Sequence, residues 1–172
     1  MSKNVLVVID MQNDFIDGAL GTKEAPAIIE NVYQVIQSFE GEVVFTRDTH
    51  FENYADTQEG KKLPIPHCIK GTNGWQINSK LKNLIKPETK IFDKITFGST
   101  ELTEYLKNNK ELEKVTLAGL CTDICIISNA LLIKANLPEV EIEVLENCCA
   151  GVTPESHINA LNAMKMCQIS VK

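Results

Sequence analysis

Polar residues follow four apolar, strand-like segments of the sequence, and they are of the types that catalyse acyl transfer or bind metals. They are Asp10 after the first segment, Asp48 and His50 after the second, Asp93 and Lys94 after the third, and Cys121 and Cys125 after the fourth. Because ligands bind outside the carboxyl ends of the strands in a parallel sheet, we expect these side chains to converge on one edge. Alone, Asp10 could cap a turn and Lys94 could be a solvated charge, so the prediction of a site depends on that convergence.

Cys125 lies in the first turn of an expected helix, where a thiol can become a nucleophile. The helix dipole and the free backbone N–H groups favour the thiolate there, and the same N–H groups can hold an oxyanion during acyl transfer. An aspartate nearby could accept the thiol proton, and a lysine could keep that aspartate ionised. The pattern indicates nucleophilic catalysis, with a buried structural thiol as the alternative.

The segment from 47 to 74 is rich in Asn, Asp, Gly, Pro and His and carries most of the candidate metal ligands. The candidates are Asp48 and His50 near its start, Asp56 and Glu59 within it, and His67 near its end. Imidazole and carboxylate ligands suit zinc, iron or manganese. A D-x-H pair alone also fits a turn aspartate beside a surface histidine. His157, on the last expected helix, is interpreted as packed or solvated and lies outside the predicted site.

Strand-like and helical patterns alternate along the whole chain. We expect strands at 4–9, 42–46, 89–92, 115–119, 140–145 and 168–171 from their apolar runs. We expect helices at 26–39, 75–85, 99–108 and 122–136, and a last helix that begins at Thr153 and Pro154, with Ser99 and Thr153 as caps. Six strands alternating with helices predict an α/β fold, a three-layer, doubly wound, mostly parallel six-stranded sheet with helices on both faces.

The composition fits a single cytoplasmic domain over residues 1–172. The chain is 44% hydrophobic and 23% charged, and at this length one core is expected. Its net charge of −6, with no basic run, argues against nucleic acid or an anionic membrane as the main partner. No apolar run is long enough to span a bilayer, and we expect no signal peptide before the first strand. The six cysteines are not spaced as a secreted disulfide framework.

Six motifs occur along the chain, at 7–15, 46–50, 66–74, 94–97, 119–126 and 147–157. They read VVIDMQNDF, TRDTH, PHCIKGTNG, KITF, GLCTDICI and NCCAGVTPESH. In this order they resemble the motifs of the isochorismatase-like cysteine hydrolases, and within that family those of the nicotinamidases. The resemblance covers essentially the whole chain and implies the isochorismatase-like hydrolase fold, in agreement with the strand and helix patterns.

The resemblance implies a catalytic triad of Asp10, Lys94 and Cys125. Asp10 would be the general base that deprotonates Cys125, and Lys94 would orient and tune the pair. The family also places a cis peptide bond just before the position of Cys121. The backbone N–H groups of Cys121 and Cys125 would form the oxyanion hole.

The resemblance also implies a metal site at Asp48, His50 and His67, with Glu59 as the carboxylate added by the intervening loop. One divalent ion is expected, zinc first, with iron or manganese as alternatives. The ion would bind the pyridine nitrogen of a small heteroaromatic amide such as nicotinamide, whose carboxamide would point at Cys125. Hydrolysis would then give the acid and ammonia through a cysteine thioester.

The chain departs from the nicotinamidase pattern around the expected substrate ring. Phe15 is retained as a ring contact, but many nicotinamidases have Trp-His-Pro where residues 49–51 of this chain read THF. A second aromatic wall, often tryptophan, is replaced by LPI at 63–65, and Tyr54 or Phe51 could substitute for it. These changes preserve the expected chemistry and leave the substrate open. The resemblance further implies a homo-oligomer, a dimer or a tetramer.

Two other functions stay open. A metal-independent amidohydrolase of the same family would act on a carbamoyl or ureido compound, and Asp48 and His50 would then be incidental. A non-catalytic binding module would not need Asp10, Lys94 and Cys125 together, which disfavours it. Isochorismate hydrolysis itself is not expected, because the enzymes that cleave that vinyl ether lack the nucleophilic cysteine.

Overall fold

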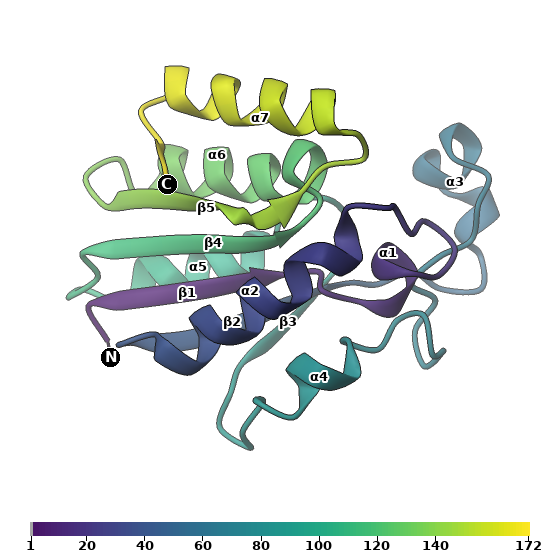
Figure 1. Ribbon diagram of the computed structural model, residues 1–172, viewed down its shortest axis with the longest axis horizontal. Coiled ribbons are helices and arrows are strands. Elements are labelled where there is room, and N and C mark those ends of the chain that lie inside the picture. The colour runs from purple at the N-terminus through teal and green to yellow at the C-terminus, as the bar shows by residue number, and fades with distance from the viewer. Residues whose placement is uncertain (1) are drawn as a thin grey trace.

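Six parallel strands form the central sheet of the computed structural model, which describes residues 2–172 (Figure 1). The strands are β1 (Asn4–Ile9), β2 (Glu42–Asp48), β3 (Ile91–Lys94), β4 (Lys114–Leu120), β5 (Glu141–Ala150) and β6 (Ser170–Val171). Their order across the sheet is β3-β2-β1-β4-β5-β6, and every neighbouring pair is parallel. The predicted doubly wound α/β fold is therefore confirmed.

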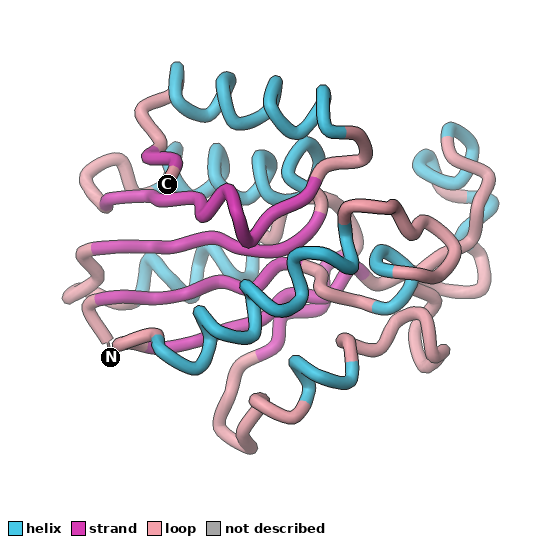
Figure 2. Tube along the Cα trace, in the orientation of Figure 1, coloured by secondary structure: helices cyan, strands magenta, loops and turns pink. Residues whose placement is uncertain are grey.

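Helices cover both faces of this sheet (Figure 2). They are α1 (Asn13–Ile16), α2 (Ala25–Ser38), α3 (Gln58–Lys62), α4 (Ser79–Lys82), α5 (Thr100–Asn108), α6 (Ile127–Asn136) and α7 (Pro154–Met166). A 3₁₀ turn, η1 (Tyr54–Asp56), and a π-helical turn, η2 (Thr122–Ile126), complete the helical segments of residues 2–172. None of these helices is long and apolar enough to cross a membrane.

The central strand β1 is buried on both faces, which explains its uninterrupted apolar run. Val5, Val7 and Ile9 pack in the layer of α5, α6 and α7, whereas Leu6 and Val8 pack in the layer of α2 and α4. Full burial of such a side chain contributes roughly 1.5–3 kcal/mol to folding. This alternation fixes β1 in the sheet and thereby fixes the position of the residue that follows it.

The order of the strands reverses its direction at the central β1–β4 pair. β2 and β3 follow β1 towards one edge, and β5 and β6 follow β4 towards the other. Such a switch point leaves a crevice outside the carboxyl ends of the strands, and α1 and α3 lie beyond these ends in Figure 1. Gly119 permits the close approach of β4 to β1 there, because a Cβ atom at its φ of +126° would lie 2.0 Å from the Ile9 carbonyl oxygen.

The helix expected at 75–85 is wrong at both ends, because α4 begins only at Ser79 and ends at Lys82. Ile77 instead forms an antiparallel bridge with Gln12, so its apolar side chain is buried from an extended segment. The segment expected to be a loop contains α3, which begins where Thr57 Oγ1 accepts a hydrogen bond from the Gly60 N–H at 3.0 Å. Both differences come from contacts that apolar spacing alone does not describe.

Two predicted helix caps are confirmed. Ser99 Oγ accepts from the Leu102 N–H at 3.1 Å at the start of α5. Thr153 Oγ1 accepts from the Ser156 N–H at 3.1 Å in a capping box at the start of α7. β2 and β3 run two residues further than expected, so Asp48 and Lys94 end their strands rather than follow them.

Candidate active site

The structure brings Asp10, Lys94 and Cys125 together at the carboxyl edge of the sheet. Asp10 directly follows β1, Lys94 ends β3, and Cys125 lies in the η2 turn after β4. Lys94 Nζ lies 2.6 Å from Asp10 Oδ2 and 3.4 Å from Cys125 Sγ. The three residues are buried, with 0%, 4% and 4% of their surfaces exposed, respectively. One ammonium group therefore contacts both an acid and a thiol in a site largely shielded from water.

Asp10 and Lys94 are held by hydrogen bonds to residues of neighbouring segments. Thr46 Oγ1 donates to Asp10 Oδ1 at 2.7 Å, and the Asp10 N–H donates to the Thr46 carbonyl at 3.3 Å. The Asp10 backbone has a φ of +48°, in the left-handed region that non-glycine residues seldom adopt. Lys94 Nζ also donates to the Thr96 carbonyl at 3.1 Å. These contacts orient both charged groups before any ligand arrives.

Burial governs the protonation of the three groups. It raises the pKa of Asp10, although the Lys94 charge opposes that rise. Burial, and then the Asp10 charge, raises the pKa of Cys125 well above its ordinary value. Burial disfavours the Lys94 ammonium, but the charges of Asp10 and Cys125 outweigh it and raise the lysine pKa. Burial and the neighbouring carboxylate therefore favour the protonated thiol and oppose the effect expected of the helix start.

The turn that carries Cys125 is π-helical, whereas a regular helix was expected from residue 122. The Ile126 N–H donates to the Cys121 carbonyl, five residues back, at 3.1 Å. The peptide bond between Leu120 and Cys121 is cis, which agrees with the family resemblance. The wider turn sets Cys125 at the head of α6 and beside Lys94.

Two polar residues outside the expected site hold this turn. Asn129 is fully buried on α6 and donates to the carbonyls of Cys125 at 2.7 Å and Phe97 at 3.0 Å. Its Oδ1 accepts a third hydrogen bond, at 2.9 Å, from the N-cap residue of α5. His157 Nδ1 on α7 lies 2.7 Å from Thr122 Oγ1 in the turn. A single amide in the largely apolar run ISNALLI is the sequence signal that could have indicated Asn129.

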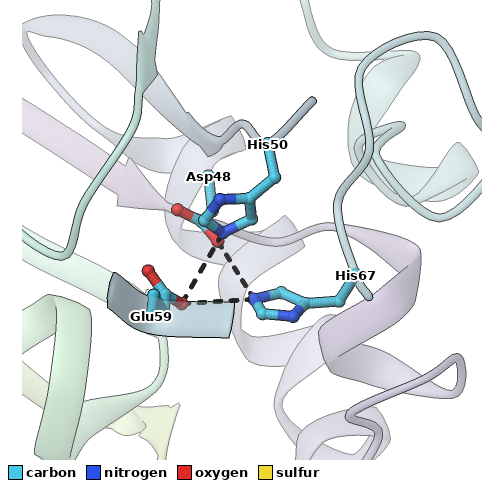
Figure 3. Close-up of side chains that lie close together, drawn as sticks. All are labelled: Asp48, His50, Glu59 and His67. Atoms are coloured by element: carbon cyan, nitrogen blue, oxygen red, sulfur yellow. Dashed lines mark hydrogen bonds and ion pairs between the residues drawn. The ribbon is translucent and has the colours of Figure 1, made fainter. Parts of the chain in front are cut away.

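Asp48, His50, Glu59 and His67 form a compact metal-ligand cluster beside these groups (Figure 3). One ligand atom from each residue lies within 4.8 Å of the others. His50 Nε2 is 2.9 Å and His67 Nε2 is 3.4 Å from Asp48 Oδ2. Glu59 Oε1 is 3.6 Å from each of the two imidazole nitrogens. The short helix α3, which was not expected, is the element that carries Glu59 into the cluster.

The donor set of this cluster fits a divalent transition metal. Two imidazole nitrogens and two carboxylate oxygens face one another, a combination that suits zinc, iron or manganese. His67 Nδ1 lies 2.8 Å from the Ile65 carbonyl, which leaves Nε2 to face the cluster. Burial opposes ionisation of Asp48, but its hydrogen bonds with His50 and His67 prevail and lower its pKa, so it offers an anionic oxygen.

Asp48 connects the metal-ligand cluster to the group formed by Asp10, Lys94 and Cys125. Its Oδ1 lies 3.5 Å from Lys94 Nζ. Gln12, fully buried and not singled out from the sequence, accepts from the Asp48 N–H at 2.7 Å and donates to the Asp48 carbonyl at 2.8 Å. The motif that supplies Asp10 therefore also positions a metal-ligand candidate.

Two aromatic rings, those of Tyr54 and Phe15, pack against the histidines of the cluster. The Tyr54 ring lies edge-on to His50, with centroids 4.8 Å apart, and to His67, with centroids 5.2 Å apart. The centroid of the Phe15 ring is 5.6 Å from that of His67. Both aromatic residues are buried, and neither is among the residues that line the cavity described next. Of the two substitutes considered for the missing aromatic wall, Phe51 is therefore the one at the cavity.

A cavity of about 630 Å³ opens beside the cluster. His50 and Glu59 line it from the cluster, and Ile124 lines it from the turn that holds Cys125. The remaining lining residues are Thr49, Phe51, Asn53, Thr57, Gln58, Lys62, Leu63, Ile95, Thr96 and Phe97. A small molecule bound here would meet both the metal-ligand cluster and the turn that holds Cys125.

Comparison with known proteins identifies the family. A family model described as the isochorismatase domain matches residues 4–171, nearly the whole chain. The chain belongs to the isochorismatase family. This result confirms the resemblance that the sequence motifs carried.

Solved structures of isochorismatase-like enzymes superpose closely on this family member. The pyrazinamidase of Pyrococcus horikoshii in complex with zinc has a TM-score of 0.84 and 28% identity, covering 99% of this chain and 98% of that one. The pyrazinamidase/nicotinamidase from Streptococcus mutans has a TM-score of 0.86 and 29% identity, covering 98% and 99%. N-carbamoylsarcosine amidase from Thermoplasma acidophilum has a TM-score of 0.82 and 26% identity, covering 99% and 95%.

Proposed function

We propose that this protein hydrolyses small heteroaromatic carboxamides, such as nicotinamide, to the acid and ammonia through a thioester on Cys125. The observation that carries the proposal is the position of Lys94 Nζ, 2.6 Å from Asp10 Oδ2, 3.4 Å from Cys125 Sγ and 3.5 Å from Asp48 Oδ1. The Lys94 ammonium group thus lies between the acid–thiol pair of Asp10 and Cys125 and the metal-ligand cluster. The pyrazinamidase and nicotinamidase names of similar structures support the same substrate class.

Acylation begins when Asp10 takes the proton of the Cys125 thiol as the sulfur attacks the carboxamide carbon. The S–C bond forms, and the carbonyl electron pair moves to oxygen, where the backbone N–H groups of Cys121 and Cys125 stabilise it. The C–N bond then breaks, and Asp10 returns the proton to the leaving nitrogen, which departs as ammonia. Lys94 keeps its charge and offsets the negative charge shared by Asp10 and Cys125.

Deacylation reverses these roles with water in place of ammonia. Asp10 accepts a proton from the water that attacks the thioester carbon. The C–S bond breaks, the sulfur of Cys125 regains a proton from Asp10, and the acid leaves. Because the site is buried, nucleophiles other than the attacking water have little access to the thioester.

Asp48, His50, Glu59 and His67 would hold one divalent ion, zinc first, with iron or manganese as alternatives. When bound, such an ion supplies a Lewis acid that can coordinate a ring nitrogen. His50 and Glu59 line the same cavity as Ile124, so a ring held at the cluster lies in the cavity that borders the Cys125 turn. We infer that the cluster orients the ring while the thiol and Asp10 carry out the covalent chemistry.

Ammonia release from a panel of amides tests this function. Pyridine-3-carboxamide and pyrazine-2-carboxamide are expected to be hydrolysed, and benzamide, which has no ring nitrogen, at least about tenfold more slowly, since one lost interaction of about 1.4 kcal/mol is a factor of ten. Cys125→Ala should abolish release from all of them. If the metal-replete protein leaves every heteroaromatic amide intact, the proposal is wrong.

A metal-independent hydrolase of carbamoyl or ureido compounds is the second candidate, favoured by the similar structure of N-carbamoylsarcosine amidase. An N-carbamoyl amino acid belongs in the same panel for this reason. Hydrolysis of that compound alone, at a rate unaffected by a chelator, would select the second candidate. Retention of stoichiometric metal and loss of activity on chelation would select the first.

A further inference from the structure

The cavity beside the metal-ligand cluster is larger than a single substituted ring requires. Its volume is about 630 Å³. Pockets of about 300–1,000 Å³ typically hold drug-sized ligands, and a pyridine ring with one carboxamide is much smaller than such a ligand. Space for a further part of the substrate therefore remains once the ring is bound.

Exposed apolar side chains line this cavity. Phe51, Ile95 and Phe97 are 51%, 73% and 42% exposed, respectively, and all three belong to its wall. Single exposed hydrophobic residues are normal on a protein surface, but a group around one cavity marks a binding site. Leu63 and Ile124, both half-buried, extend the apolar wall inward.

The residues of this apolar wall are neighbours in sequence of the residues proposed to bind metal and to react with substrate. Phe51 directly follows His50, and Ile124 directly precedes Cys125. Ile95 and Phe97 flank the residue whose carbonyl accepts a hydrogen bond from Lys94 Nζ. A ligand that reaches the metal-ligand cluster and the thiol from this cavity must therefore pass along apolar side chains.

We propose that the preferred substrate is a heteroaromatic carboxamide with an apolar substituent, about the size of a propyl group, on a ring carbon remote from the carboxamide. The substituent packs against Phe51, Leu63 and Phe97, while the ring faces His50 and the carboxamide reaches the catalytic turn. This inference rests on the proposed amidase function and specifies its substrate class. Each buried methylene strengthens binding about fourfold, so a propyl arm is expected to raise kcat/KM at least about tenfold.

The test compares kcat/KM for pyridine-3-carboxamide with that for its 5-propyl and 6-propyl derivatives. Wild type should prefer at least one propyl derivative by about tenfold or more. Leu63→Trp fills the cavity and should reduce that preference to about threefold or less. Met166→Trp adds the same side chain at an 85% exposed position of α7 outside the cavity and should keep the wild-type preference.

Binding to Cys125→Ala, measured by calorimetry, gives a readout that needs no turnover. The propyl derivative should have the lower Kd, and adding Leu63→Trp should remove the difference. A wild-type enzyme that hydrolyses pyridine-3-carboxamide best and binds no propyl derivative more tightly would overturn this inference and leave the amidase function intact. That result is also expected if a second copy of the chain covers the apolar wall. Failure to hydrolyse any amide of the series would overturn the amidase function as well.

Discussion

Lys94 Nζ lies 2.6 Å from Asp10 Oδ2, and the side chains of both residues are at most 2% exposed. A buried ion pair of this kind depends on both partners, because removal of one leaves an uncompensated charge in a medium that solvates it poorly. The pair therefore holds a carboxylate ready beside the Cys125 thiol without help from bulk water. The mechanism depends on this arrangement.

Asp10→Asn removes the proposed base and keeps a side chain of the same shape. Its amide oxygen can accept from Lys94 Nζ in place of Oδ2, and its NH2 group can donate to Thr46 Oγ1. Asp48 Oδ1, 3.5 Å from Lys94 Nζ, still offsets the lysine charge, so the variant should fold and retain metal. Because general base catalysis contributes about 10²–10⁴-fold, the acylation rate should fall by at least about 10²-fold. Single-turnover ammonia release measures that rate. Acylation at the wild-type rate would show that the thiol proton goes elsewhere.

The pH dependence of kcat/KM should reflect the raised pKa values of Asp10 and Cys125. Burial raises the pKa of Asp10 above 3.8, so the base is lost, and kcat/KM falls, at a higher pH than for an ordinary aspartate. Burial raises the pKa of Cys125 above 9.0, so the thiol stays protonated up to that pH. Ionisation of the thiol should therefore cause no change in kcat/KM at or below pH 9.0. Metal content measured at each pH separates the acid limb from loss of metal. An acid limb that is unchanged in Asp10→Asn would contradict its assignment to Asp10.

Metal binding should depend on the histidines of the cluster and on no other histidine. His50→Ala and His67→Ala should each lose stoichiometric zinc, because each removes one imidazole from the donor set. His157→Ala is the matched control, since His157 contacts Thr122 outside the cluster, and it should retain the metal. Elemental analysis of protein purified without chelators measures the content. Equal metal in all three variants and wild type would contradict the assignment.

Asn129→Ala should reduce both stability and activity. It removes the donors to the carbonyls of Cys125 and Phe97, and buried groups left without partners cost about 1–3 kcal/mol each. Asn136→Ala is the control on the same helix, because Asn136 makes the equivalent bond to the Leu132 carbonyl at 2.9 Å but is exposed. The control should change the free energy of unfolding by less than about 0.5 kcal/mol. Denaturant unfolding and kcat for both variants test the difference.

The sequence predicted the helices and strands well where the local pattern of apolar and capping residues favours a single type of element. The apolar run of β1 is short and rich in Val and Ile, which favours a strand buried on both faces, and the Thr153-Pro154 pair gives α7 a cap and a first turn. The segment that begins at Trp75 has apolar residues that fit a helix equally well. Its pairing with Gln12 is a contact between distant parts of the chain, so local spacing could not indicate it.

The convergence of Asp10, Lys94 and Cys125 could be predicted because strand topology carries them to one edge, but their supporting partners could not. Thr46 faces Asp10 because Val8 of β1 is paired in register with Phe45 of β2, and the sequence does not specify that register. Glu59 reaches the metal-ligand cluster because a short helix forms within an expected loop. The raised pKa of Cys125 follows from its depth of burial, which depends on the packing of the complete fold.

Mass spectrometry of acid-quenched single turnovers tests the central claim, acylation of Cys125, most directly. During turnover of pyridine-3-carboxamide, the peptide that contains Cys125 should gain the mass of the pyridine-3-carbonyl group while one equivalent of ammonia is released. Cys121→Ala, which keeps the backbone N–H of that residue, should still form the adduct, and Cys125→Ala should form none. Cys167 is the exposed cysteine, so the Cys167→Ser background excludes transfer of the acyl group to it. Ammonia release by Cys125→Ala, or an acyl group found on another cysteine, would contradict the account.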